Sequence, residues 1–256
     1  MSDRTSAVRV GLVYPELLGT YGDRGNAVVL VERCRRRGIE AELVEVPAGE
    51  PLPASLDVYL FGGGEDDAQV MAAAGMRASA ATIASARDAG AVVFAVCAGF
   101  QLLGTTYEAG DGDILAGLGL VDLETRAGEG RLIGECLVVP EPTTGLTVLT
   151  GFENHGGRTT LGAGVEPLGH VTAGHGNGVG GVDGLLGERM LGTYLHGPVL
   201  PRNPALADHL LAWVVGADRV TPLDDGLVDA LRAERLEDAA RTGMAARRRD
   251  RHLNRG

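Results

Sequence analysis

The sequence predicts an α/β fold: a doubly wound, mainly parallel sheet with helices on both faces and extra antiparallel strands in the second half. In the first half, short apolar runs of the kind buried in a parallel sheet alternate with segments of helical periodicity. In the second half, short apolar runs are separated by glycine-rich turns, which is typical of shorter and partly antiparallel strands.

Each element of the first half rests on a local pattern. β-branched and aliphatic residues run together in four segments, and apolar residues recur at helical spacing in three others. The expected strands are residues 8–14, 41–46, 56–61 and 92–96, and the expected helices are 27–36, 70–76 and 78–89. Because parallel strands joined by helices present their carboxyl ends at one edge, a ligand site is expected at that edge.

The second half contains four further strand candidates and a return to helix near the end. The strands are expected within residues 131–139, 146–154, 166–173 and 189–197, and the helices at 203–215 and 223–240. Neither a repeat nor a linker interrupts residues 1–216, which we expect to form one domain. Residues 217–256 are then a C-terminal helical extension, and its arginine-rich end from Arg241 is expected to be a solvated or disordered tail.

Composition excludes several classes of function. No apolar stretch approaches the roughly 20 residues of a membrane span and no signal peptide is recognisable, so we expect a cytoplasmic protein without direct membrane insertion. The net charge of −11 disfavours a general nucleic-acid surface. Three irregularly spaced cysteines argue against a disulfide framework and a zinc site, and the phosphate-binding pattern GxxxxGK[ST] is absent.

Cys97 is the leading candidate for a nucleophile, because it follows a buried strand and precedes a glycine-led helix start. At such a turn the thiol projects from the sheet edge, the N–H of Ala98 faces an oxyanion, and the helix N-terminus favours the thiolate. The alternative is a cysteine that fills core volume. We favour that alternative for Cys34 and Cys136, which lack a glycine-bracketed turn.

Two further loops are expected at the same edge of the sheet. One contains Tyr21, Asp23 and Asn26, and the other is the glycine run 62–64. Glycines let the main chain approach a substrate closely, so this run is a candidate for a second N–H donor to an oxyanion. Its alternative interpretation is an ordinary flexible turn.

A cysteine nucleophile needs a base, and His196 is the first choice among six histidines. It stands where a strand exits into a loop, although a structural histidine is an alternative there. His155 is the second choice, since it shares a glycine-bracketed loop with Glu153, Asn154 and Arg158. The weaker candidates are His170, His175, His209 and His252.

Several of these segments together resemble the class I (triad-type) glutamine amidotransferases, in the cobyrinate-amidase-like branch. Within that branch the chain is similar to the glutaminase subunits of lipid II isoglutaminyl synthases, over roughly residues 7–216. The matching motifs are YGDRGN at 21–26, AVCAGFQLLG at 95–104, RLIGE at 131–135, GFENHGGRT at 151–159 and GTYLHGP at 192–198.

The resemblance implies a role for each matching residue. It makes Cys97 the nucleophile and His196 the base. Arg131 matches a glutamine-binding arginine, whose fork suits an α-carboxylate, while an exposed surface arginine is the alternative. Gln101 is a substrate contact or a helix-surface residue. The candidates for the oxyanion hole are Gly63, Gly64 and Ala98.

One departure from the wider class concerns the group that orients the histidine. Many class I amidotransferases have an acid two residues after the histidine, and this chain has Pro198 there. The cobyrinate-amidase-like branch commonly lacks that glutamate, so a catalytic dyad is expected. Glu153 or Asp23 could orient His196, and sequence spacing leaves the third member unassigned.

The resemblance also implies the reaction and its setting. L-Glutamine is hydrolysed to glutamate and ammonia without a metal or organic cofactor in this chain. The ammonia passes to a Mur-ligase-like partner in a hetero-oligomer, which uses ATP and Mg to amidate the α-carboxyl of D-glutamate in lipid II during peptidoglycan biosynthesis. Lipid II is reached through that partner.

Three other interpretations stay open at this stage. The chain could serve another synthetase, as in the amidation of corrinoid precursors. It could be a catalytically silent amidotransferase fold that works as a binding subunit, which the missing acid would favour. A cysteine hydrolase on an α/β-hydrolase fold is the third, and it would turn over esters without a preference for glutamine.

Overall fold

The computed structural model describes residues 7–20, 22–109 and 112–238 of the chain. A six-stranded sheet forms its centre, in the order β11-β12-β4-β3-β1-β2. Strands β12, β4, β3, β1 and β2 are parallel, and β11 pairs antiparallel with β12 at one edge. The bounds are β1 Val8–Val13, β2 Ala41–Val46, β3 Val58–Phe61, β4 Val92–Val96, β11 Leu185–Gly187 and β12 Met190–Thr193.

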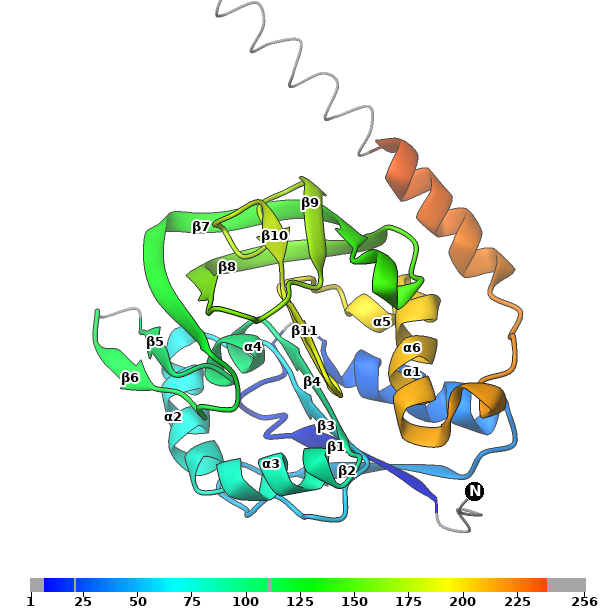
Figure 1. Cartoon of the computed structure of the whole chain (residues 1–256), viewed down its shortest axis with the longest axis horizontal. Coiled ribbons are helices and arrows are strands. Elements are labelled where there is room, and N and C mark those ends of the chain that lie inside the picture. Colours follow the sequence, from blue (N-terminus) through cyan, green and yellow to red (C-terminus); the bar gives the residue numbers. More distant parts are fainter. Residues whose placement is uncertain (1–6, 21, 110–111, 239–256) are drawn as a thin grey trace, which may run out of the picture.

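Helices cover both faces of this central sheet. In Figure 1, α1, α5 and α6 lie on one side of the sheet, and α2, α3 and α4 lie on the other. Their bounds are α1 Arg24–Arg35, α2 Asp66–Arg77, α3 Ala80–Asp88, α4 Ala98–Leu102, α5 Val199–Arg202 and α6 Pro204–Val215. The predicted doubly wound α/β fold is therefore confirmed, with element ends that differ from the predicted ones by a few residues. All side chains of β3 and β4 are buried, as their uninterrupted apolar pattern predicted.

A second, mainly antiparallel sheet, in which only the β5–β7 pair among the described strands is parallel, lies across the carboxyl edge of the first (Figure 1). Its centre is the long pair β7 and β8, which is interrupted by a register shift between Ala127 and Leu132. The bounds are β5 Thr106–Glu108, β6 Ile114–Ala116, β7 Leu123–Pro140, β8 Leu149–Leu161, β9 Gly169–Ala173 and β10 Val182–Asp183. The strand β7 begins eight residues before the predicted start at residue 131, because the polar, glycine-rich stretch 123–130 hides the strand pattern.

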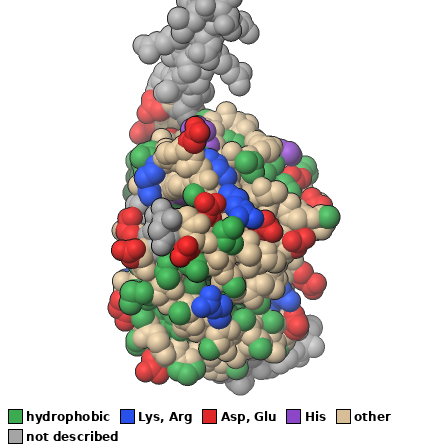
Figure 2. All heavy atoms as spheres, turned by 90° about the vertical axis from the view of Figure 1, so that its left-hand side faces the viewer, with side chains coloured by type: hydrophobic (Ala, Val, Ile, Leu, Met, Phe, Trp, Pro, Cys, Tyr) green, Lys and Arg blue, Asp and Glu red, His purple; other side chains and the backbone are tan. Residues whose placement is uncertain are grey.

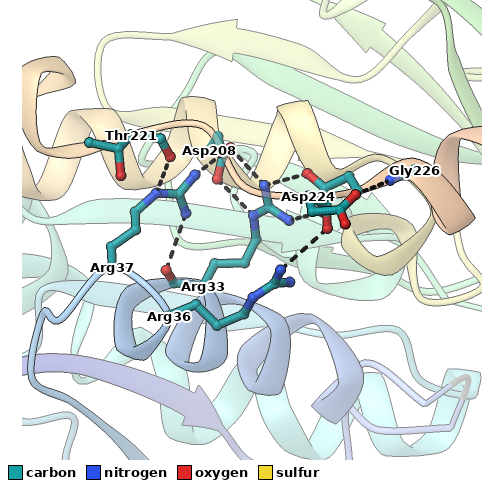
Figure 3. Close-up of polar contacts among 8 residues, drawn as sticks. Arg33, Arg36, Arg37, Asp208, Thr221, Asp224 and Gly226 are labelled. Carbon is teal, nitrogen blue, oxygen red and sulfur yellow. Dashed lines mark hydrogen bonds and ion pairs between the residues drawn. The ribbon is translucent and has the colours of Figure 1, made fainter.

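Arg33 on α1, with Arg36 and Arg37 just after it, binds α6 and the segment that follows α6 (Figure 3). Arg33 donates to both carboxylate oxygens of Asp208, at 2.7 Å, and to both of Asp225, at 2.8 Å. Arg37 adds a 2.8 Å bond to Asp208, and Arg36 donates to the main chain of Asp224. These charge-assisted hydrogen bonds attach both α6 and the residues just before the next helix to α1.

Residues 226–238 are helical, inside the predicted range 223–240. The described chain also contains two short 3₁₀ turns: η1 Pro142–Thr144 lies between β7 and β8, and η2 Ala217–Arg219 follows α6. The predicted arginine-rich tail lies outside the described residues. No helix among residues 7–20, 22–109 and 112–238 is long and apolar enough to cross a membrane.

Candidate active site

The main chain at Cys97 forms a strained elbow between β4 and α4. Its φ of +50° and ψ of −109° lie outside the regions that a residue with a side chain prefers. Two hydrogen bonds hold the elbow: the N–H of Cys97 donates to the Thr193 carbonyl at 2.9 Å, and the N–H of Gly99 donates to the Gly62 carbonyl at 3.0 Å. A Cβ on Gly99 would lie 2.6 Å from the Cβ of Phe61, so a side chain there would push α4 away from the end of β3.

Burial determines the protonation state of the Cys97 thiol. The residue is 4% exposed, and this burial together with the negative charge of Asp23 raises its pKa to about 12, against the smaller lowering effects of the Ala98 N–H and Arg131. The N–H of Ala98 at the start of α4 lowers the thiol pKa, as expected for a helix N-terminus, but burial outweighs this effect in the resting site. The free thiol needs a base at the moment of attack.

His196 follows the end of β12, the strand next to β4 in the sheet. Its main chain exchanges two hydrogen bonds with Phe152 of β8, at 2.8 and 3.1 Å, which attach this strand end to the second sheet. Burial, and secondarily the positive charge of Arg131, lowers the imidazole pKa to about 4. His196 is therefore neutral near pH 7 and can accept a proton.

A cavity of about 240 Å³ opens beside Cys97, between α2, β5 and the β7–β8 pair. Four other predicted site residues line it, namely Ala98, Gln101, Arg131 and Gly64, and so does His155. His196 is not among the described residues that line it. The remaining lining residues are Gln69, Glu108, Ala127, Gly128, Gly130, Gly156 and Gly157. Figure 2 shows this side of the molecule, where acidic and basic side chains are interspersed with apolar ones.

The glycine run 62–64 approaches the Asp23 loop, as predicted from topology. The N–H of Gly63 donates to Asp23 Oδ2 at 2.7 Å, so this predicted oxyanion donor is engaged within the protein. A Cβ on Gly62 would lie 2.0 Å from the Leu18 carbonyl oxygen, which explains why the turn cannot carry a side chain. Gly64 lines the cavity and, with Ala98, remains a candidate for the oxyanion hole.

Gln101 belongs to a buried hydrogen-bond chain that includes Gln69 and Tyr194, which were not predicted as site residues. It is 8% exposed; its Oε1 accepts from Gln69 Nε2 at 2.7 Å, and its Nε2 donates to the Tyr194 hydroxyl at 3.1 Å. The Tyr194 hydroxyl also bonds Thr159, which bonds Thr125. The helix-surface interpretation of Gln101 is therefore wrong. Tyr194 lies inside the GTYLHGP motif, whereas no sequence signal marks Gln69.

The two acids considered for orienting His196 differ in their surroundings. Glu153 is fully buried, and its carboxylate accepts from His175 Nδ1 at 2.8 Å and from the N–H groups of His175 and Gly176. Asp23 accepts from Gly63 and Asn26, and burial raises its pKa to about 6. Its charge acts on Cys97. The third member of the site stays unassigned.

The comparisons with known proteins identify the family. The sequence profile of the CobB/CobQ-like glutamine amidotransferase domain matches residues 9–204. The chain belongs to this family. Among the residues described for this amidotransferase, no group of three His, Cys, Asp or Glu side chains is placed to hold a metal ion. The predicted absence of a cofactor stays a prediction.

Curated relatives of the amidotransferase fall into two groups. The lipid II isoglutaminyl synthase (glutamine-hydrolysing) subunit GatD of Staphylococcus aureus is 38% identical over 76% of this chain and 79% of its own length. The subunit of the same name from Streptococcus pneumoniae is 32% identical over 90% of this chain and 91% of its own. A probable cobyric acid synthase of Methanoregula boonei is 33% identical over 72% of this chain but 38% of its own.

Solved structures support the fold of the amidotransferase. A crystal structure of a glutamine amidotransferase matches with a TM-score of 0.55 at 23% identity, over 80% of this chain and 98% of that one. PurLQS from Thermotoga maritima matches with a TM-score of 0.51 at 16% identity, over 90% of this chain and all of that one. At these identities the likeness concerns the fold.

Proposed function

We propose that this chain is a glutaminase subunit that hydrolyses the side-chain amide of L-glutamine. The observation that carries the proposal is the strained Cys97 elbow, which places a buried thiol in a cavity that also contains Arg131. The strand end with His196 is bonded to the same elbow through the Thr193 carbonyl. Family membership supports glutamine as the substrate.

In the proposed mechanism, neutral His196 removes the thiol proton as Cys97 Sγ attacks the amide carbon. N–H groups of Ala98 and Gly64 stabilise the oxyanion, and protonated His196 then gives its proton to the departing ammonia. Water attacks the resulting γ-glutamyl thioester with His196 as base, which releases glutamate and restores the thiol. Glutamine and one water are converted to glutamate and one ammonia.

The ammonia, in this proposal, passes to a Mur-ligase-like synthetase in a hetero-oligomer. That partner uses ATP and Mg to amidate the α-carboxyl of D-glutamate in lipid II, a step of peptidoglycan biosynthesis in the cytoplasm. The share of each relative's length that matches this chain supports this partner. The GatD subunits match over 79% and 91% of their length, whereas the cobyric acid synthase of Methanoregula boonei matches over 38%. This comparison favours lipid II over corrinoid precursors.

The test measures ammonia and glutamate released from L-glutamine by the chain purified with its synthetase partner. Cys97→Ala should abolish release, and Cys34→Ala is the matched control because Cys34 is a buried thiol on α1, away from the cavity. Equal rates for Cys97→Ala and the unmodified chain would refute the assignment. A complex without any glutaminase activity would support the alternative of a catalytically silent binding subunit. Mass spectrometry of amidated lipid II tests whether the released ammonia is used for lipid II.

A further inference from the structure

Two charged side chains line the Cys97 cavity, and they have opposite signs. Among the described lining residues, Arg131 is the cation and Glu108 is the anion, and the others are neutral groups or the thiol itself. Both lie beside the irregular stretch of β7 where the pairing with β8 shifts register. A cavity with one cation and one anion is suited to a zwitterion, and a free amino acid is a zwitterion at its α-carbon.

Glu108 is held in place yet retains capacity to bind a ligand. It is the last residue of β5, and its Oε2 accepts the N–H of Ala127 at 3.2 Å. Oε1 accepts no hydrogen bond from the described residues. Arg131 is similar: its Nε and Nη2 donate to Asn154 at 2.8 and 3.0 Å, which leaves the Nη1 hydrogens and one Nη2 hydrogen for a carboxylate.

His155 provides a second acceptor near Glu108. It is 2% exposed and stacks on Tyr194, its Nδ1 bonds the Gly157 carbonyl at 2.9 Å, and its Nε2 has no partner among the described residues. Ala127, which bonds Glu108, and Gly157, which bonds His155, face each other in the β7–β8 pair. Glu108 and His155 are thus both bonded to the same residue pair of the β7–β8 ladder. A buried ring nitrogen that lacks a hydrogen-bond donor costs free energy, and a ligand N–H would remove this cost.

We propose that Glu108, assisted by Nε2 of His155, binds the α-ammonium group of glutamine while Arg131 binds its α-carboxylate. An ammonium offers three N–H donors, which matches a carboxylate oxygen and a neutral imidazole nitrogen. This inference rests on the proposed glutaminase function and adds its specificity: the site selects free L-glutamine and rejects glutamine whose amino group is acylated or part of a peptide.

The experiment compares two substrates on the intact complex with the synthetase partner. L-Glutamine carries the α-ammonium, and glutaramate (4-carbamoylbutanoate) has the same amide and carboxylate without it. Glu108→Gln should raise KM for L-glutamine about tenfold or more with little change in kcat, because a charge-assisted hydrogen bond is lost. The kcat/KM for glutaramate should change less than about twofold. Glu124→Gln, at an exposed carboxylate on β7, is the matched control.

The outcomes separate this inference from the proposed function. Equal losses for both substrates in Glu108→Gln would assign Glu108 a structural role through Ala127 and overturn the inference, as would unchanged kinetics. Failure of the unmodified complex to release ammonia from either substrate would instead overturn the glutaminase function. A His155→Asn variant that loses activity on L-glutamine but not on glutaramate would support the second acceptor.

Discussion

The two sheets of this molecule contribute differently to the site. The parallel sheet provides Cys97 and His196 from buried strand ends, where burial determines both pKa values. The β7–β8 pair provides Arg131 and His155 from a glycine-rich and partly exposed region with a register shift. In the proposed mechanism, the rigid apolar sheet therefore holds the reacting groups, whereas the irregular sheet recognises the substrate.

The largest expected effect comes from removing the base on the parallel sheet. His196→Gln should lower kcat/KM for glutamine by roughly 10²–10⁴-fold, because the proposed acceptor of the thiol proton is lost. His209→Gln, on the outer helix α6, is the control. An activity close to that of the unmodified chain would transfer the role of base to another residue, and His155 would be the next candidate.

The pH dependence of kcat/KM tests the protonation of His196. The pKa of His196 is lowered to about 4, so the base form persists across neutral pH and is lost only as the pH falls through about 4. The pH profile of kcat/KM, measured where the protein remains folded, should therefore show its acid limb below about pH 5. An acid limb near the usual histidine pKa of about 6.5 would contradict the burial argument.

A smaller effect is expected on the second sheet. Arg131→Lys should raise KM for glutamine by about 10- to 100-fold and leave kcat within a few-fold, because a lysine cannot form the bidentate contact with a carboxylate. Steady-state kinetics of ammonia release measure both constants. Arg126→Lys, at an exposed position of β7, is the control. A loss of kcat as large as that in His196→Gln would break the proposed division between the sheets.

The smallest effect concerns the hydrogen-bond chain that joins the sheets. Tyr194→Phe should lower the free energy of unfolding by about 1–3 kcal/mol, because Gln101 and Thr159 would lose a buried partner. Tyr107→Phe is a matched control, since the buried Tyr107 hydroxyl has no partner among the described residues and its removal should be nearly neutral. Denaturant unfolding measures the free energy of unfolding of both variants. Equal losses in the two variants would show that the hydrogen bonds of Tyr194 add no stability.

The predictable part of the site lies where local pattern and topology agree. The run 92–96 is apolar on both faces and the glycine at 99 permits close packing, so the elbow at Cys97 follows from the sequence. The second sheet was harder to predict, because its strand start at 123–130 is polar and rich in glycine. Gln69 and Glu108 carry no motif, and their roles arise from packing against residues far away in the chain.

The sequence by itself determined the α/β class, the strand-to-helix turn at Cys97, the strand end at His196 and the family motifs. Only the tertiary structure decided that Cys97 is a protonated thiol, that Gly63 is bonded to Asp23, and that Glu108 faces the same cavity as Arg131. The physical reason is that periodicity and turn chemistry act over a few residues. Burial, charge proximity and cavity shape instead depend on segments that meet only after folding.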